Sequence, residues 1–94
     1  MYKVEWSDLS LDRVEEICEY IELDSISNSI KFSKEIFSKE VLLRNNPYLG
    51  IMVPEYNIEE FRQIFIGNYR LAYKIIGKTI LIVTIRHCKQ EELF

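Results

Sequence analysis

The side chains best suited to chemistry are the basic groups in the last third of the chain. They are Arg62, Arg70, Lys74, Arg86, His87 and Lys89. Arg70 is a candidate for holding a phosphate group through two parallel hydrogen bonds, and Lys74 and Lys89 would add positive charge. His87 is a candidate general acid or base, because imidazole exchanges a proton near neutral pH. A single histidine at the end of a strand is more often structural or solvated, so a catalytic role and a structural role for His87 both stay open.

Other kinds of catalytic centre lack the residues that they need. The chain has one histidine and two cysteines, Cys18 and Cys88, which have no metal-ligand spacing. We therefore expect neither a metal site nor a cofactor, and two free thiols in place of a disulfide. A Ser/His/Asp triad is also not expected, because no motif places a serine near His87.

The basic residues belong to a run of predicted strands. Three stretches have the two-residue period of strands, namely residues 61–66, 69–76 and 79–85. The dipeptides between them, Gly67-Asn68 and Gly77-Lys78, are signals for two-residue hairpins. Residues 2–6 alternate in the same way, so we expect one more short strand at the N-terminus.

Two helices are predicted between the first strand and the others. Ser7 and Asp8 are suitable N-caps for a helix that runs to about Leu23, and a second helix runs to about Arg44. Asn45-Asn46-Pro47 ends the second helix. The predicted fold is therefore α+β with the order β-α-α-β-β-β, an antiparallel sheet with the N-terminal helical hairpin packed on one face.

Two-residue hairpins fix the register of the strands, and the register assigns side chains to the two faces of the sheet. The predicted core face holds Ile64, Ile66, Tyr69, Leu71, Tyr73, Ile75, Ile80 and Ile82. The other face is mixed and holds Gln63, Phe65, Arg70, Ala72, Lys74, Leu81, Val83 and His87. Arg62 and Arg86 are expected at the rim of the core face. A one-residue bulge would exchange some of these positions.

Size and composition indicate one small domain over residues 1–94. Hydrophobic residues make up 48% of the chain, and the formal net charge is -3 with a pI of about 5.2. A protein that binds polyanions usually carries a positive excess, so nucleic-acid binding would have to rely on the local basic patch. The N-terminus has no apolar signal-peptide core, and no run approaches the roughly 20 apolar residues of a membrane span. We expect a cytoplasmic protein without a membrane partner.

Several motifs occur in an order that is typical of one family. They are Asn46-Pro47-Tyr48-Leu49-Gly50, Val53-Pro54-Glu55, Phe61-Arg62, the strand from Gly67 to Ile75, and the stretch from Ile80 to His87. The most specific is Gly-x-Tyr-Arg-x-x-Tyr at 67–73, followed by a strand that ends in histidine. Over essentially its whole length the chain resembles toxins of the RelE/ParE superfamily of type II toxin–antitoxin systems. The resemblance is closest to ParE-like members, also known as plasmid-stabilisation proteins.

The resemblance implies a growth-inhibiting bacterial toxin that contacts DNA gyrase. A contact of this kind needs no acid and base, and its expected residues are Arg62, Phe65, Arg70, Arg86 and His87. The alternative is a RelE-like, metal-independent endoribonuclease that cleaves mRNA on the ribosome with Arg70, His87, Lys74 and Lys89. Gln90 replaces a family arginine and no tyrosine follows Tyr73, which favours the non-enzymatic interpretation. A degenerate, non-toxic interaction module is the third possibility.

The resemblance also implies a cognate antitoxin, and hence a hetero-oligomer. The second helix has two apolar sides, one with Ile30, Phe37 and Val41 and one with Phe32, Ile36 and Leu43. A groove between the helical hairpin and the sheet would suit an amphipathic helix or an added strand. We predict that Phe32, Ile36 and Leu43 contact the antitoxin there.

Overall fold

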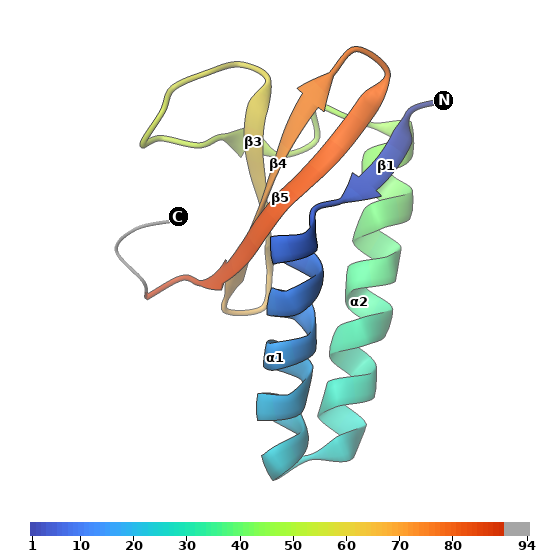
Figure 1. The fold of residues 1–94 in the computed structure, drawn as a ribbon, viewed down its shortest axis with the longest axis vertical. Helices are drawn as coiled ribbons and strands as arrows, with labels where there is room; N and C mark the ends of the chain where they lie inside the picture. The colour runs from blue at the N-terminus through green and yellow to red at the C-terminus, as the bar shows by residue number, and fades with distance from the viewer. Residues whose placement is uncertain (90–94) are drawn as a thin grey trace.

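Seven helices and strands make up the described part of the chain. The structure is a computed structural model, and it describes residues 1–89. In chain order the elements are β1 (Lys3–Trp6), α1 (Asp8–Asp24), α2 (Ile26–Asn45), β2 (Ile51–Met52), β3 (Phe61–Ile66), β4 (Tyr69–Ile76) and β5 (Thr79–His87) (Figure 1). The α+β class and the predicted order of elements are confirmed, with β2 as one additional short strand.

The strands form one five-stranded sheet in the order β1-β5-β4-β3-β2. Neighbours from β2 to β5 are antiparallel, as predicted, but β1 runs parallel to β5, so the sheet is mixed. A parallel neighbour needs a long crossover, and the helices and the other strands supply it here. The pairing of β1 begins with a hydrogen bond of 2.9 Å from Lys3 N to Lys78 O and ends with one of 3.0 Å from Ser7 N to Ile82 O.

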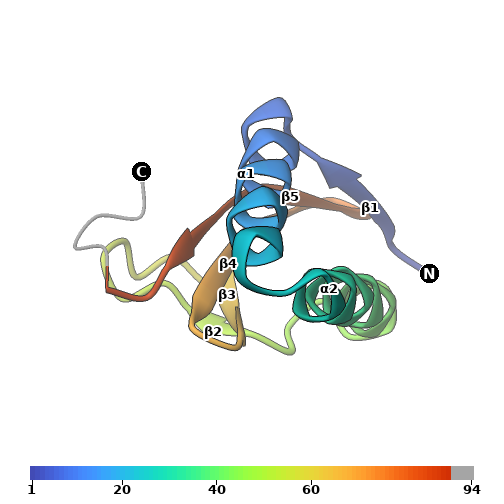
Figure 2. The same ribbon diagram turned by 90° about the horizontal axis from the view of Figure 1, so that it is seen from below.

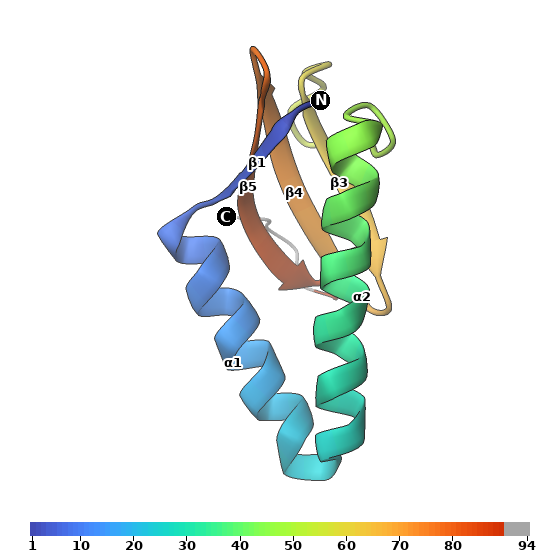
Figure 3. The same cartoon turned by 90° about the vertical axis from the view of Figure 1, so that its right-hand side faces the viewer.

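The two helices form a tight hairpin with a single linking residue. Ser7 caps α1 by accepting a hydrogen bond from Ser10 N, and Ser25 caps α2 by accepting one from Asn28 N. Ser25 also ends α1, because its backbone N–H donates to Ile21 O. In Figure 3, α2 lies in front of the sheet, and α1 joins it at one end and diverges from it toward the other. In the view along the helices in Figure 2, α1 lies over β5.

The core lies between this hairpin and the sheet. The predicted core-face residues Ile64, Ile66, Leu71, Tyr73, Ile75, Ile80 and Ile82 are all buried, and Tyr69 is partly buried against them. Burying side chains of this size stabilises the fold by about 1.5–3 kcal/mol each. The strand register that was predicted from the two hairpins is therefore confirmed for β3 with β4 and for β4 with the first half of β5.

The side of α2 that was predicted to contact the antitoxin is part of this core. Phe32, Ile36 and Leu43 are buried against the sheet, so in this structure they offer no surface to a partner. Both sides of α2 are apolar, so the sequence leaves open which side packs on the sheet, and in the structure the sheet covers the side with Phe32. The exposed side carries Ile30, Phe37 and Val41, whose exposed fractions are 53%, 66% and 39%.

A bulge in β5 changes the predicted faces near its end. Ala72 pairs with Thr84 and Tyr73 pairs with Ile82, which leaves Val83 without an opposite residue on β4. Beyond the bulge, His87 lies opposite Tyr69 and Arg86 lies opposite Arg70. His87 therefore belongs to the helix-covered side of the sheet and Arg86 to the mixed side, the reverse of the predicted assignment.

The mixed side of the sheet is partly covered by the connection between β2 and β3. Val53, Phe61 and Ala72 are buried in a small second cluster there, with Val83 packed against it. The connection turns back through Asn57, whose φ of 51° is in the left-handed region that asparagine tolerates. The mixed face is thus not an open, solvated surface along its whole length.

Candidate functional site

Three of the predicted target-binding residues lie in one row across the sheet. Phe65 on β3 is opposite Arg70 on β4, and Arg70 is opposite Arg86 on β5. Directly paired residues project to the same side, so the side chains of Phe65, Arg70 and Arg86 leave the sheet on one side. Phe65 is 49% exposed, which leaves about half of its surface for a partner.

Arg70 is held by an acidic residue of the covering connection. Its Nη2 donates a hydrogen bond to Oε2 of Glu55 within an ion pair, and the two side chains are 15% and 34% exposed. This hydrogen bond holds the pKa of the Glu55 carboxyl below its usual value, more strongly than partial burial raises it. The sequence motif contained Glu55, but nothing in its position 15 residues before Arg70 identified it as the partner of that residue.

Arg62, another predicted target-binding residue, holds loops of its own chain. Its Nε donates to Glu59 O at 2.8 Å and its Nη1 donates to Gly50 O at 2.7 Å. The guanidinium group also lies over the ring of Tyr48, 4.9 Å from the centroid. With these contacts within the chain, Arg62 fixes the connections on both sides of β2.

A buried tyrosine anchors the same connection from the core side. Tyr73 Oη donates to Pro47 O at 2.7 Å and accepts a hydrogen bond from Gly50 N at 2.9 Å. Burial raises the pKa of the Tyr73 hydroxyl, opposed in part by the Gly50 N–H and the charge of Arg62. The family motif from Asn46 to Gly50 and the second tyrosine of the strand motif thus belong to one structural unit.

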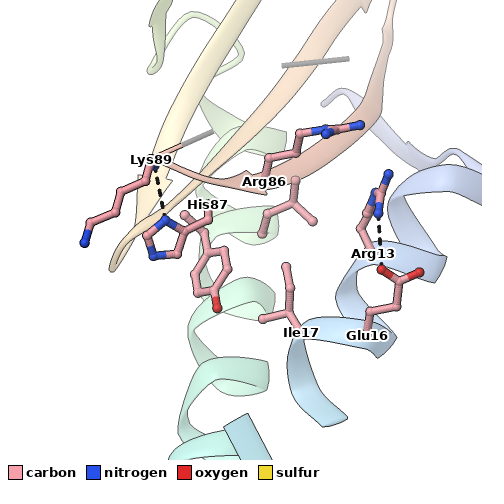
Figure 4. Close-up of a pocket in the computed structure, with 8 residues that line it drawn as sticks. Arg13, Glu16, Ile17, Arg86, His87 and Lys89 are labelled. Atoms are coloured by element: carbon pink, nitrogen blue, oxygen red, sulfur yellow. Dashed lines mark hydrogen bonds and ion pairs between the residues drawn. The ribbon is translucent and has the colours of Figure 1, made fainter. Parts of the chain in front are cut away.

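A second group of predicted residues lines an open pocket of about 410 Å³ between α1 and the end of β5. Arg13, Glu16 and Ile17 of α1 line it on one side (Figure 4). Tyr69, Ile85, Arg86, His87 and Lys89 line it on the other. Arg13 Nη1 and Glu16 Oε2 are 3.2 Å apart in an ion pair. Arg13 had no place in the predicted site, because it lies more than 70 positions from His87 in the sequence.

His87 is held at this pocket by its neighbours. Its ring meets the Tyr69 ring edge-on, with the centroids 5.3 Å apart, and its Nδ1 accepts a hydrogen bond of 3.1 Å from Lys89 N. In Figure 4 the Arg86 side chain extends away from His87, toward the side on which Arg13 lies. Gln90, which replaces a family arginine, lies outside the described residues.

The four predicted catalytic residues do not converge. Arg70 and Lys74 project from β4 to the mixed side, whereas His87 and Lys89 line the pocket on the α1 side. A general acid must be within hydrogen-bonding reach of the group that it protonates. Within the described range, 1–89, no cluster of three or more His, Cys, Asp or Glu side chains could hold a metal ion. No helix in that range is long and apolar enough to span a membrane.

The chain was compared with known protein families, curated proteins and solved structures. Residues 4–92 match the family model described as "ParE toxin of type II toxin-antitoxin system, parDE". Curated proteins give no significant match. The fold is similar to a solved chain described as "Chromosomal ParDE TA system from P. aeruginosa", with a TM-score of 0.74, 18% identity and coverage of 93% of this chain and 96% of that one. Since the family model spans nearly all of the chain, and with it both the Arg70 row and the pocket at His87, the chain belongs to the ParE toxin family of type II toxin–antitoxin systems.

Proposed function

We propose that this chain inhibits DNA gyrase by direct protein–protein contact and is neutralised by a cognate antitoxin. One observation carries the choice of contact over catalysis. The candidate catalytic groups lie on two sides of the sheet, with Arg70 and Lys74 on one and His87 and Lys89 on the other. In addition, the Arg70 guanidinium is already engaged by Glu55. This arrangement does not support a ribonuclease centre, whereas a binding surface needs no such convergence.

The proposed contact surface is the row of Phe65, Arg70 and Arg86 with the neighbouring Lys74. Aromatic rings and arginines carry a large share of the free energy of protein–protein binding. Phe65 supplies an exposed ring, and Lys74 is exposed on the same face of β4, four residues beyond Arg70. The ion pair with Glu55 keeps Arg70 oriented along this surface, and an acidic group on the target could replace Glu55 as its partner.

The proposed antitoxin surface is the exposed side of α2 rather than the buried side. Ile30, Phe37 and Val41 follow the spacing of one helix face, and Lys31 and Lys34 line a shallow hollow beside Ile30. An amphipathic antitoxin helix with apolar and acidic residues would complement this stripe.

Another face of α2 borders the proposed target surface. A hollow of about 340 Å³ is lined by Lys39 and Leu42 of α2, by Leu49 and Ile51, and by Phe65 on β3. An antitoxin segment that continues from α2 into this hollow would cover the Phe65 ring. We therefore propose that neutralisation occurs because the antitoxin and the target compete for Phe65.

A supercoiling assay with purified gyrase tests this proposal. We expect the isolated chain to inhibit supercoiling, and Phe65→Ala to raise the required concentration roughly tenfold, as for a binding hot spot. Ile76→Ala is the matched control, because Ile76 is similarly exposed but lies at the opposite end of β4. Normal supercoiling with excess folded protein would contradict the proposal. Cleavage of mRNA on added ribosomes would instead identify a RelE-like ribonuclease. Absence of both activities would indicate a non-toxic binding module.

A further inference from the structure

We propose that the pocket between α1 and β5 binds a small organic phosphate, a compound of nucleotide size with one phosphate group and an apolar or planar body. This site lies on the other side of the sheet from the proposed gyrase contact, apart from Arg86, which borders both. The inference does not depend on the identity of the toxin's target. Its argument rests on charge, on unsatisfied donors and on the shape of the pocket.

The charge of the pocket matches a phosphate monoester. Arg13, Arg86 and Lys89 are three permanent cations, and Glu16 is the one carboxylate among the lining residues. The site therefore carries a net charge of about two positive units with His87 neutral, and a phosphate monoester carries about −1.5 to −2 at neutral pH. A ligand with one carboxylate group would neutralise only half of the positive charge of the site.

The two arginines have hydrogen-bond donors that the protein does not use. The Nε atoms of Arg13 and Arg86 are shielded from solvent and have no acceptor among the described residues. Arg86 also has no ion pair within residues 1–89, in contrast to Arg13, which pairs with Glu16. Buried donors without acceptors are uncommon in folded proteins. A phosphate toward which the two arginines turn would give these donors acceptors, since a guanidinium group binds two oxygens of one phosphate through parallel hydrogen bonds.

The floor of the pocket is apolar and aromatic. Ile17 and Ile85 provide aliphatic surface, and the Tyr69 ring packs edge-on against the His87 ring. A volume of about 410 Å³ lies in the range of small-ligand sites, roughly 300–1,000 Å³. Inorganic phosphate alone would leave this floor uncovered, so the body of an organic phosphate is expected to add affinity.

The surroundings favour a small ligand over a nucleic-acid strand. Asp12, Glu15 and Glu19 are exposed on α1, the helix that forms one wall, and the whole chain has a net charge of -3. A long polyanion would run past these carboxylates and be repelled. A single phosphate can stay beside the cationic lining of the pocket, close enough that salt screens the attraction little.

The test is an NMR titration of the isolated, isotopically labelled chain with adenosine 5′-monophosphate, inorganic phosphate and adenosine. We expect saturable shifts at the amides of residues 13–17, 69 and 85–89 with the monophosphate, weaker binding of inorganic phosphate, and at least tenfold weaker binding of adenosine. Arg86→Gln should weaken monophosphate binding roughly tenfold, the usual effect of losing a charge-assisted hydrogen bond. Lys78→Gln, which removes one charge from the turn between β4 and β5, at the other end of β5 from the pocket, should have no effect.

Several results would overturn the proposal. Absence of saturable shifts at the pocket, equal binding of adenosine and its monophosphate, or equal binding by Arg86→Gln and the unmodified chain would each do so. A short single-stranded oligonucleotide without a terminal phosphate that binds more tightly than the monophosphate would assign the pocket to nucleic acid instead. If Arg86→Gln loses the dispersed spectrum of a folded protein, Lys89→Gln takes its place, with the same expected loss.

Discussion

The hydroxyl of Tyr73 joins the core to the connection that leads into β2, and Tyr73→Phe tests how much this contributes to stability. The substitution removes one oxygen and keeps the buried ring, so the packing of the core is unchanged. Two backbone groups lose their partner, the N–H of Gly50 and the carbonyl of Pro47. Gly50 is buried, whereas Pro47 is partly exposed and can find water instead.

The magnitude follows from this difference in burial. A buried donor without an acceptor costs about 1–3 kcal/mol, and a hydrogen bond that water can replace contributes about 0.5–1.5 kcal/mol. We expect Tyr73→Phe to lower the free energy of unfolding by about 2 kcal/mol. For a domain of this size this corresponds to a fall in Tm of about 8–16 °C, since each kcal/mol is worth about 4–8 °C.

Urea unfolding followed by circular dichroism measures this loss directly. Tyr20→Phe is the control, because Tyr20 is 71% exposed on α1 and should change stability by less than about 0.5 kcal/mol. If Tyr73→Phe is as stable as this control, the two hydrogen bonds of Tyr73 do not hold the connection in the way argued above.

Three further changes test separate contacts. Glu55→Gln should lower stability by about 0.5–1 kcal/mol at about pH 7. Arg70 depresses the pKa of Glu55, so this contribution is present above the pKa of the unfolded carboxyl and is lost as the pH falls through the lower, folded value. In a pH series of urea melts, the stabilities of wild type and variant should therefore converge as the pH becomes strongly acidic. Gly50→Ala should destabilise by about 1–3 kcal/mol in thermal unfolding, since its Cβ would lie 2.4 Å from Gln63 O, and an unchanged Tm would contradict this packing. Phe37→Asp should weaken antitoxin binding at least tenfold in calorimetry while leaving the Tm unchanged, and unaltered affinity would exclude this side of α2.

The sheet could be predicted from the sequence because its signals are local. Gly67 and Gly77 have φ values of 57° and 58°, in the left-handed region that two-residue hairpins require and glycine adopts without strain. These two turns fix the register of β3 with β4 and of β4 with the first half of β5. Serine caps and the Asn-Asn-Pro stop likewise placed both helices.

The contacts that the sequence did not reveal depend on tertiary packing. Both sides of α2 are apolar, and only the position of the sheet decides that Phe32 is buried and Phe37 is exposed. The ion pair between Glu55 and Arg70 depends on how the β2–β3 connection folds back over the sheet. No local pattern encodes either arrangement. The same limit applies to the pocket, where Arg13 of α1 lies close to the end of β5.

The bulge at Val83 is the one irregularity whose signal was present in the sequence. Apolar residues occupy alternate positions at Ile80 and Ile82, but the next isoleucine is Ile85, so the alternation changes phase between them. In an unbroken register Ile85 would leave the core. The bulge returns it to the core, where it is fully buried, and Ser7 stabilises the bulge because its Oγ donates to Val83 O at 2.7 Å. The same shift carries His87 to the side of Tyr69 and leaves Arg70 on the other, so one inserted residue separates the pocket from the proposed target surface.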